Sequence, residues 1–292
     1  MRCSLDEISA RTTDGVTLKI DRLRPPNGTR GAIVCLHAMM TDGRYFGARK
    51  SGDADSFAHV LAKSGFEVFV PDFRGHGRSQ PPTAKQGDWS FDDLAELDLP
   101  AIVTACASAA SCAARDLVLL GHSLGGLVST AALGTGRIPS PRLLVLASTS
   151  VWLPGPNGPL ARRAVMGAYR AAAQLLGYAP IRRLRVGTAD EAATYVRQLT
   201  GWAQSGHWTS LRGIDYTSSA ETVTTPVLPF CGAGDWMCTP RDAAAFLGHL
   251  PCAADLRVVG TRRGDALDPD HFQLFTRDEL TPMWHELVDR LK

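Results

Sequence analysis

The sequence lacks any apolar run that approaches the roughly 18 residues needed to span a membrane. Its N-terminal stretch, MRCSLDEISARTTDG, is polar and has no apolar core of the kind a signal peptide requires. No block of lysine and arginine is long enough for a nucleic-acid arm, and the formal net charge is only +2. We therefore expect a soluble, cytoplasmic protein with no membrane span and no nucleic-acid partner.

The seven cysteines form neither a disulfide framework nor a zinc motif. Their number is odd, and no pair has C-x-x-C spacing. Cys35 and Cys231 lie in apolar runs typical of buried strands, so we interpret the cysteines as reduced, small hydrophobic side chains. No ligand cluster with metal spacing occurs in the sequence, and we expect no metal and no organic cofactor.

Short apolar runs alternate with amphipathic segments along most of the chain. Continuous apolar runs predict buried strands at 31–36, 66–70, 116–120, 143–148, 226–232 and 254–260. Helical spacing is found at 54–64, 91–110, 124–134, 240–249 and 277–291, and Pro100 should kink or split the second of these helices. Residues 5–24 alternate around Thr13-Asp14-Gly15, which predicts a hairpin. The pattern indicates an α/β fold with a mostly parallel sheet of about eight strands, covered by helices on both faces.

Residues 150–225 interrupt this alternation. They contain helical stretches at 159–176 and 189–203, several aromatic residues, and eight arginines against four acidic residues. Long insertions in such sheets usually emerge at the carboxyl edge of the strands, where ligands bind. We predict a helical lid at 150–225 over a core formed by 1–149 and 226–292. In this lid Arg182, Arg183 and Arg185 either bind an anionic substrate or form a solvated helix face.

The segment Gly121-His122-Ser123-Leu124-Gly125 directly follows an apolar run. Where a strand turns sharply into a helix, the residues two before and two after the apex come close in space, and glycine removes the resulting clash. The turn then exposes the apical serine at the top of the sheet, as in the G-x-S-x-G nucleophile elbow. Ser123 is therefore the candidate nucleophile.

A serine hydroxyl is a poor nucleophile without a base, and the base needs an orienting carboxylate. In enzymes with this elbow, the acid and then the histidine follow the serine along the chain. Asp235 comes just past a predicted strand in a glycine-bearing turn, and the end of the preceding strand has no acid. His271 lies in the loop after the last predicted strand, whereas His249 and His285 lie in helical patterns. We predict the triad Ser123, Asp235 and His271.

Together, LHAMM, DFRGHGRS, GHSLGG, GAGDW and DPDHF resemble the α/β-hydrolase superfamily, in its lid-bearing esterase and lipase branch. The resemblance covers nearly the whole chain outside 150–225. It implies an oxyanion hole formed by the backbone N–H groups of Met39 and Leu124, and it implies that His76 belongs to the scaffold. The family usually has His-Gly where this chain has His37-Ala38, which predicts a loop of different shape because alanine disfavours positive φ.

The remaining candidate residues concern the substrate. Met40, His122, Trp152 and Trp236 are expected to contact a small-molecule acyl substrate. A serine at the elbow indicates an acyl-enzyme, so we predict a serine hydrolase that cleaves a carboxylic ester. The alternatives are a thioesterase, an acyltransferase or cyclase with the same intermediate, a C–C bond hydrolase, or a non-catalytic ligand-binding protein that retains the hydrolase fold.

Overall fold

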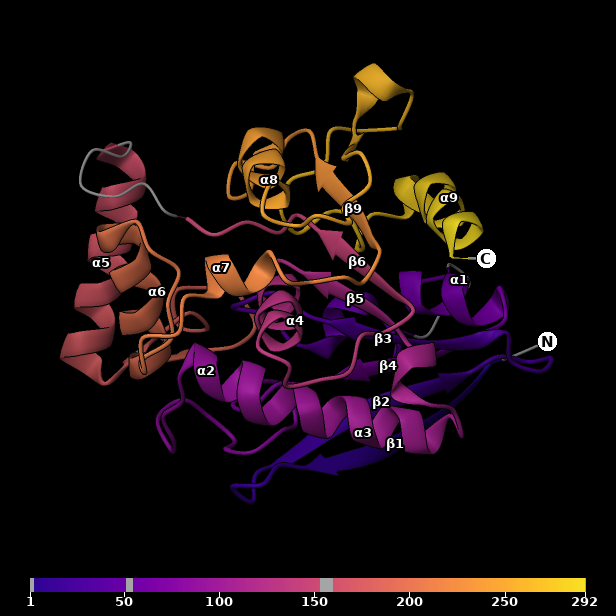
Figure 1. Ribbon diagram of the computed structural model, residues 1–292, viewed down its shortest axis with the longest axis horizontal. Coiled ribbons are helices and arrows are strands. Elements are labelled where there is room, and N and C mark those ends of the chain that lie inside the picture. The colour runs from indigo at the N-terminus through magenta and orange to yellow at the C-terminus, as the bar shows by residue number, and fades with distance from the viewer. Residues whose placement is uncertain (1–2, 51–54, 153–159, 292) are drawn as a thin grey trace.

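The computed structural model describes residues 3–50, 55–152 and 160–291. Its main feature is one sheet of eight strands in the order β1-β2-β4-β3-β5-β6-β9-β10 (Figure 1). The strands are β1 (Ser4–Arg11), β2 (Thr17–Arg24), β3 (Gly31–Leu36), β4 (Phe66–Pro71), β5 (Val118–His122), β6 (Leu143–Ala147), β9 (Val227–Gly232) and β10 (Arg257–Val259). The β1–β2 and β2–β4 pairs are antiparallel, and the other pairs between these strands are parallel. The predicted fold class and edge hairpin are confirmed.

Different helices cover the two faces of the sheet (Figure 1). They are α1 (Phe57–Lys63), α2 (Phe91–Asp93), α3 (Leu99–Ala109), α4 (Leu124–Gly134), α8 (Pro240–Leu247) and α9 (Thr281–Arg290). Alternate side chains of β3 point to opposite faces. Val34 and Leu36 therefore belong to the apolar core beneath α3 and α4, whereas Ile33 and Cys35 belong to the core beneath α1 and α9.

Two predicted elements differ in detail from the observed ones. The helix expected at 91–110 is divided into α2, a wider π-helical turn at Leu94–Asp98, and α3. Pro100, which has no N–H to donate, lies in the first turn of α3, directly after this π-helical turn. The strand expected at 254–260 is reduced to β10, which pairs only with residues 230–232 of β9.

The segment between β6 and β9, residues 150–225, is called the insertion below. Its described elements are α5 (Leu160–Leu176), β7 (Tyr178–Ala179), β8 (Glu191–Ala192), α6 (Ala193–Ser205) and α7 (Tyr216–Ala220). Helices α5 and α6 pack together at the end of the molecule opposite α1 and α9, whereas α7 packs on α4 (Figure 1). Within the described ranges, no helix is both long enough and apolar enough to cross a membrane.

The parallel strands bring residues that are distant in sequence to one edge of the sheet. Strands β3, β5, β6, β9 and β10 all point the same way, so their carboxyl ends meet there. His37 follows β3, Ser123 follows β5, Asp235 follows β9, and His271 lies in the loop after β10. This edge is therefore where the candidate catalytic groups can meet.

Candidate active site

Ser123 occupies a strained turn between β5 and α4. Its backbone has φ 52° and ψ −108°, a conformation that L-residues rarely adopt. The flanking glycines are sterically required: a Cβ on Gly121 would lie 2.4 Å from the backbone N of Gly126, and one on Gly125 would lie 2.4 Å from the carbonyl oxygen of Leu36. The turn leaves the Ser123 side chain partly exposed, at a cavity described below. These are the features of a nucleophile elbow.

Asp235 and His271 form a buried hydrogen-bonded pair. His271 Nδ1 lies 2.8 Å from Asp235 Oδ2, and both residues are 2% exposed. Because Nδ1 faces a carboxylate, it carries the proton, which leaves Nε2 as the basic nitrogen. Within the described residues Nε2 has no hydrogen-bond partner, and His271 lines the same cavity as Ser123. The arrangement presents an unpartnered basic nitrogen near the candidate nucleophile.

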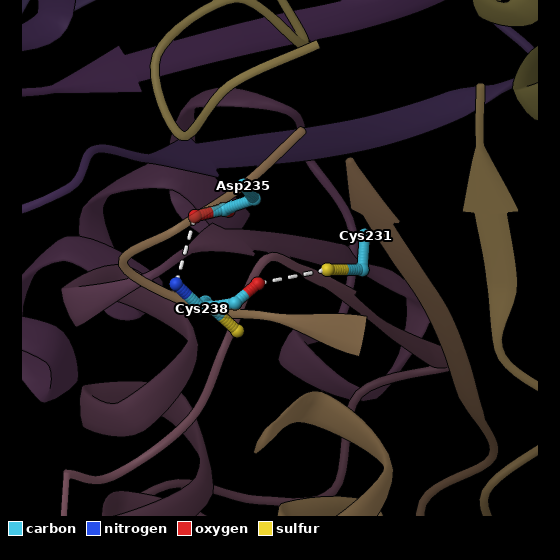
Figure 2. Close-up of side chains that lie close together, drawn as sticks. All are labelled: Cys231, Asp235 and Cys238. Carbon is cyan, nitrogen blue, oxygen red and sulfur yellow. Dashed lines mark hydrogen bonds between the residues drawn. The ribbon is translucent and has the colours of Figure 1, made fainter. Parts of the chain in front are cut away.

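The turn after β9 fixes the Asp235 carboxylate. Its Oδ1 accepts hydrogen bonds from the backbone N–H groups of Met237 (2.9 Å) and Cys238 (2.7 Å). Figure 2 shows that Cys238 is also held from its other side, because the Cys231 thiol donates to the Cys238 carbonyl oxygen at 3.1 Å. Both oxygens of Asp235 are thus occupied, one by the turn and one by His271.

The same three side chains have the composition of a metal site. Possible ligand atoms of Cys231, Asp235 and Cys238 lie within 4.8 Å of one another (Figure 2). However, the hydrogen bond with Cys231 and burial raise the pKa of the Cys238 thiol far above its ordinary value. Metals bind thiolates, and Asp235 is already engaged by His271. Cys231 and Cys238 therefore suit a structural role, holding the turn that binds the Asp235 carboxylate, better than they suit a metal centre.

The loop after β3 presents the second predicted oxyanion donor. His37 Nε2 accepts the Phe73 N–H at 3.1 Å, and Nδ1 donates to the Ala38 carbonyl oxygen at 2.8 Å. Burial and the neighbouring His76 lower the pKa of His37 to about 3, so it stays neutral. The left-handed residue of this loop is Met40 (φ 62°) and not Ala38, so alanine is accommodated without strain at the position where the family has glycine.

Met39 and Leu124, the predicted oxyanion donors, line one cavity together with Ser123 and His271. Leu124 is the first residue of α4, so its N–H has no acceptor in the preceding turn of the helix. Within the described residues, no hydrogen bond involves the Met39 N–H. Neither N–H group has a backbone acceptor among the described residues, which is what an oxyanion donor requires before a ligand binds.

The cavity has a volume of about 420 Å³ and is apolar. Its walls come from the β3 and β9 loops, from α4, and largely from the insertion. The insertion contributes Ser150, Val151, Trp152, Val165, Met166, Ala168, Tyr169, Ala172, Ala179, Pro180, Ile181, Leu184, Val186, Tyr195 and Leu199. No Asp, Glu, Lys or Arg is among the described lining residues. Such walls select for uncharged, apolar ligands.

Three of the four predicted substrate residues line this cavity: Met40, Trp152 and Trp236. Trp236 is 59% exposed, and its ring centroid lies 6.3 Å from that of Trp152. His122 does not line the cavity, and its predicted role is corrected. It is 0% exposed and stacks on Tyr45 with ring centroids 4.9 Å apart and planes 8° apart. Its ring neighbours Tyr45 and Phe275 belong to the core beneath α1 and α9.

The arginines of the insertion do not line this cavity. Arg182 lines a separate surface cavity of about 380 Å³, and neither Arg183 nor Arg185 lines the catalytic one. The anionic-substrate hypothesis therefore has no support in this geometry. Conversely, Tyr169, Tyr195 and Met166 line the cavity although no local sequence signal indicates it. Helical periodicity predicts the two helices but does not indicate which helix face meets the cavity.

The DFRGHGRS segment is structural, as the resemblance implies. Arg74 is buried and pairs with Asp98, with Nε 2.8 Å from Oδ1. Asp72 accepts hydrogen bonds from the backbone N–H groups of Gly43 (2.7 Å) and Arg78 (3.0 Å). These contacts tie the segment after β4 to the loop after β3.

Comparisons with known proteins bear on the family and the fold of this chain. The family described as "Serine aminopeptidase, S33" (Hydrolase_4) matches residues 47–259. The lipase lipl-1 of Caenorhabditis elegans is 26% identical over 141 residues, which span 44% of this chain and only 34% of that lipase.

Two solved structures resemble nearly the whole chain. DcsB in complex with its substrate analogue superposes with a TM-score of 0.68 at 18% identity, covering 99% of this chain and 97% of that one. The Pyrococcus furiosus esterase PF2001 gives a TM-score of 0.61 at 19% identity, covering 99% and 89%. At these identities the likeness concerns the fold. The family match shows that this chain belongs to the serine aminopeptidase S33 family and is an α/β-hydrolase enzyme, and the shared fold agrees with this assignment.

Proposed function

We propose that the protein hydrolyses apolar carboxylic esters through an acyl-enzyme. His271 Nε2 takes the proton of Ser123 while Oγ attacks the ester carbonyl carbon, and the N–H groups of Met39 and Leu124 bind the oxyanion. The C–O bond to the alcohol then breaks, and His271 returns the proton to the leaving alkoxide. Water, deprotonated by His271, releases the acid and restores Ser123. The observation that carries this proposal is the Asp235–His271 pair and the strained Ser123 at one apolar cavity.

The apolar cavity favours an ester over the amino-terminal peptide that the family description suggests. An aminopeptidase has to bind a free α-ammonium group, and a buried ammonium needs a carboxylate or several carbonyl oxygens. The described walls hold no Asp or Glu side chain. We therefore expect hydrolysis of p-nitrophenyl acyl esters and little hydrolysis of aminoacyl p-nitroanilides.

The insertion is proposed to act as the lid that selects the acyl group. Helix α5 contributes Met166, Tyr169 and Ala172 to the cavity, and α6 contributes Leu199. These side chains bury apolar substrate surface, which is worth about 25 cal/mol per Å². The insertion should accordingly determine which acyl chain lengths are accepted, whereas the catalytic residues lie at the carboxyl edge of the sheet.

The proposal is tested by labelling with a fluorophosphonate probe and by turnover of p-nitrophenyl esters of increasing acyl length. Wild type should be labelled and should turn over, and Ser123→Ala should do neither. A burst of p-nitrophenol without further turnover would instead indicate an acyltransferase or cyclase whose acyl acceptor is missing. Absence of labelling in folded wild type would overturn the proposal in favour of ligand binding.

A further inference from the structure

The insertion holds the loop that carries the candidate oxyanion donor. The Met40 carbonyl oxygen accepts the N–H groups of Thr188 (2.8 Å) and Ala189 (3.2 Å), and the Met40 N–H donates to Glu191 Oε1 at 2.6 Å. The approach is close enough that a Cβ on Gly187 would lie 2.3 Å from the Met40 carbonyl oxygen. Met40 is thus fixed on both sides by one short stretch of the insertion.

Glu191 is also the partner of a buried histidine of the core. Glu191 and His76 each have side chains that are 0% exposed, and His76 Nε2 lies 3.3 Å from Glu191 Oε1. His76 Nδ1 lies 2.8 Å from the Arg74 carbonyl oxygen. Both ring nitrogens therefore face acceptors, and only an imidazolium can donate to both.

This protonation state contrasts with that of the adjacent His37. The two ring centroids are 4.9 Å apart, yet His37 accepts a backbone N–H and is neutral. Burial opposes a charge on His76, but the Glu191 carboxylate outweighs it, and the pKa of His76 is raised. A buried carboxylate with one charged partner is stable only while that partner keeps its proton.

The position of Met40 gives this ion pair a function. Met40 has a positive φ that a non-glycine residue adopts only when its surroundings impose it, and it directly follows Met39. Glu191 Oε1 accepts the N–H of the peptide bond that joins Met39 to Met40. We propose that Glu191, charged and paired with His76, is a positioning residue that holds the Met39 N–H in the oxyanion hole. This inference rests on the proposed function.

The groups around the pair determine its pH dependence. His76 faces Glu191, the Arg74 carbonyl, the ring of His37 and the ring of Trp89, and Asp72 also favours its charge.

Around Glu191, the phenols of Tyr169 and Tyr195 lie close enough that its charge adds to the effect of burial in raising their pKa values. These phenols stay neutral, so His76 is the neighbour of Glu191 whose titration removes the positive charge of the pair. Loss of the His76 proton would leave a lone pair facing the carboxylate and would loosen the loop.

The experiment compares Glu191→Ala, Glu191→Gln and the control Gln198→Ala. Gln198 makes a matched buried contact between insertion and core, since its Nε2 lies 2.6 Å from Asp92 Oδ1, but it does not touch Met40. Folding is checked by circular dichroism and thermal melting, and kcat and KM are measured with one p-nitrophenyl ester. We expect Glu191→Ala to lower kcat about tenfold or more with little change in KM, because the loss falls on the transition state.

Glu191→Gln retains an acceptor for the Met40 N–H and should recover most of kcat, and Gln198→Ala should keep it. Wild-type kcat should fall as pH rises through the raised pKa of His76, and Glu191→Gln should lack this alkaline decline. Equal kcat in folded Glu191→Ala and Gln198→Ala, or a decline unchanged in Glu191→Gln, would overturn the inference alone. A folded wild type that neither hydrolyses esters nor takes the fluorophosphonate label would instead overturn the proposed function.

Discussion

His271 donates from Nδ1 to Asp235 across 2.8 Å, although the two residues are 36 positions apart and follow different strands. The bond selects one tautomer of the imidazole and leaves Nε2 without a proton at the cavity. Asp235 is in turn immobilised by two backbone N–H groups of its own turn. In the proposed mechanism, the folding of the β9 turn therefore fixes the direction of proton transfer before any substrate enters.

Replacing Asp235 by Asn should test this relationship directly. An amide can donate its N–H to Nδ1, which would stabilise the tautomer with the proton on Nε2 and leave no base for Ser123. We expect kcat to fall by about 10⁴-fold with little loss of stability. The exposed Asp255→Asn serves as the control for charge removal, and equal activities of the two variants would exclude the assigned role.

The nucleophile elbow gives a second prediction, based on sterics. Gly125→Ala places a Cβ 2.4 Å from the backbone oxygen of Leu36, which cannot move without displacing β3. The free energy of unfolding should fall by about 3 kcal/mol or more, with loss of activity. Gly201→Ala in α6 meets nothing within 4 Å and should raise stability by about 0.5–1 kcal/mol. Chemical denaturation of both variants measures this contrast, and similar stabilities would contradict it.

The sequence was informative where chemistry is encoded in local patterns. Ser123 lies between sterically required glycines, and Asp235 and His271 follow apolar strands in a fixed order, so short segments sufficed to propose these three residues as a triad. The Glu191–Met40 contact joins residues 151 positions apart and has no local signature. Which residues of α5 and α6 meet the cavity depends in the same way on how the insertion docks.

The error at His122 has a simple geometric cause. Adjacent residues at the end of a strand point to opposite faces of the sheet, so proximity to Ser123 in sequence does not imply proximity to substrate. His122 stacks on Tyr45 and lies 6.0 Å, centroid to centroid, from the ring of Phe275, in the core under α1 and α9.

The proposed acyl site leads to a third prediction. Ala172 on α5 lines the cavity, so Ala172→Phe should fill part of its 420 Å³ and exclude long acyl chains. We expect kcat/KM for long-chain p-nitrophenyl esters to fall about tenfold relative to the acetate, since a few methylenes lose their burial. Ala171 is exposed and does not line the cavity, which makes Ala171→Phe the matched control. An unchanged chain-length profile in Ala172→Phe would place the acyl group elsewhere.

The last prediction concerns the dependence of stability on pH. Burial and the nearby His271 hold the pKa of His122 well below its ordinary value, so His122 is neutral in the folded protein. In the unfolded chain it titrates near 6.5, so below that pH the unfolded state binds the additional proton. The free energy of unfolding should therefore be constant with respect to His122 above about pH 6.5 and should fall as the pH decreases below it.

His122→Phe keeps a flat ring against Tyr45 and removes the titrating group. Between roughly pH 6 and pH 5, the free energy of unfolding of wild type should decrease more steeply than that of His122→Phe. The difference in slope should be about 1.4 kcal/mol per pH unit. His37, whose pKa is lowered to about 3, should give both proteins a similar residual slope. Urea denaturation at a series of pH values measures the two slopes. If they coincide, His122 takes up a proton in the folded state, and the packing against Tyr45 must then accommodate an imidazolium.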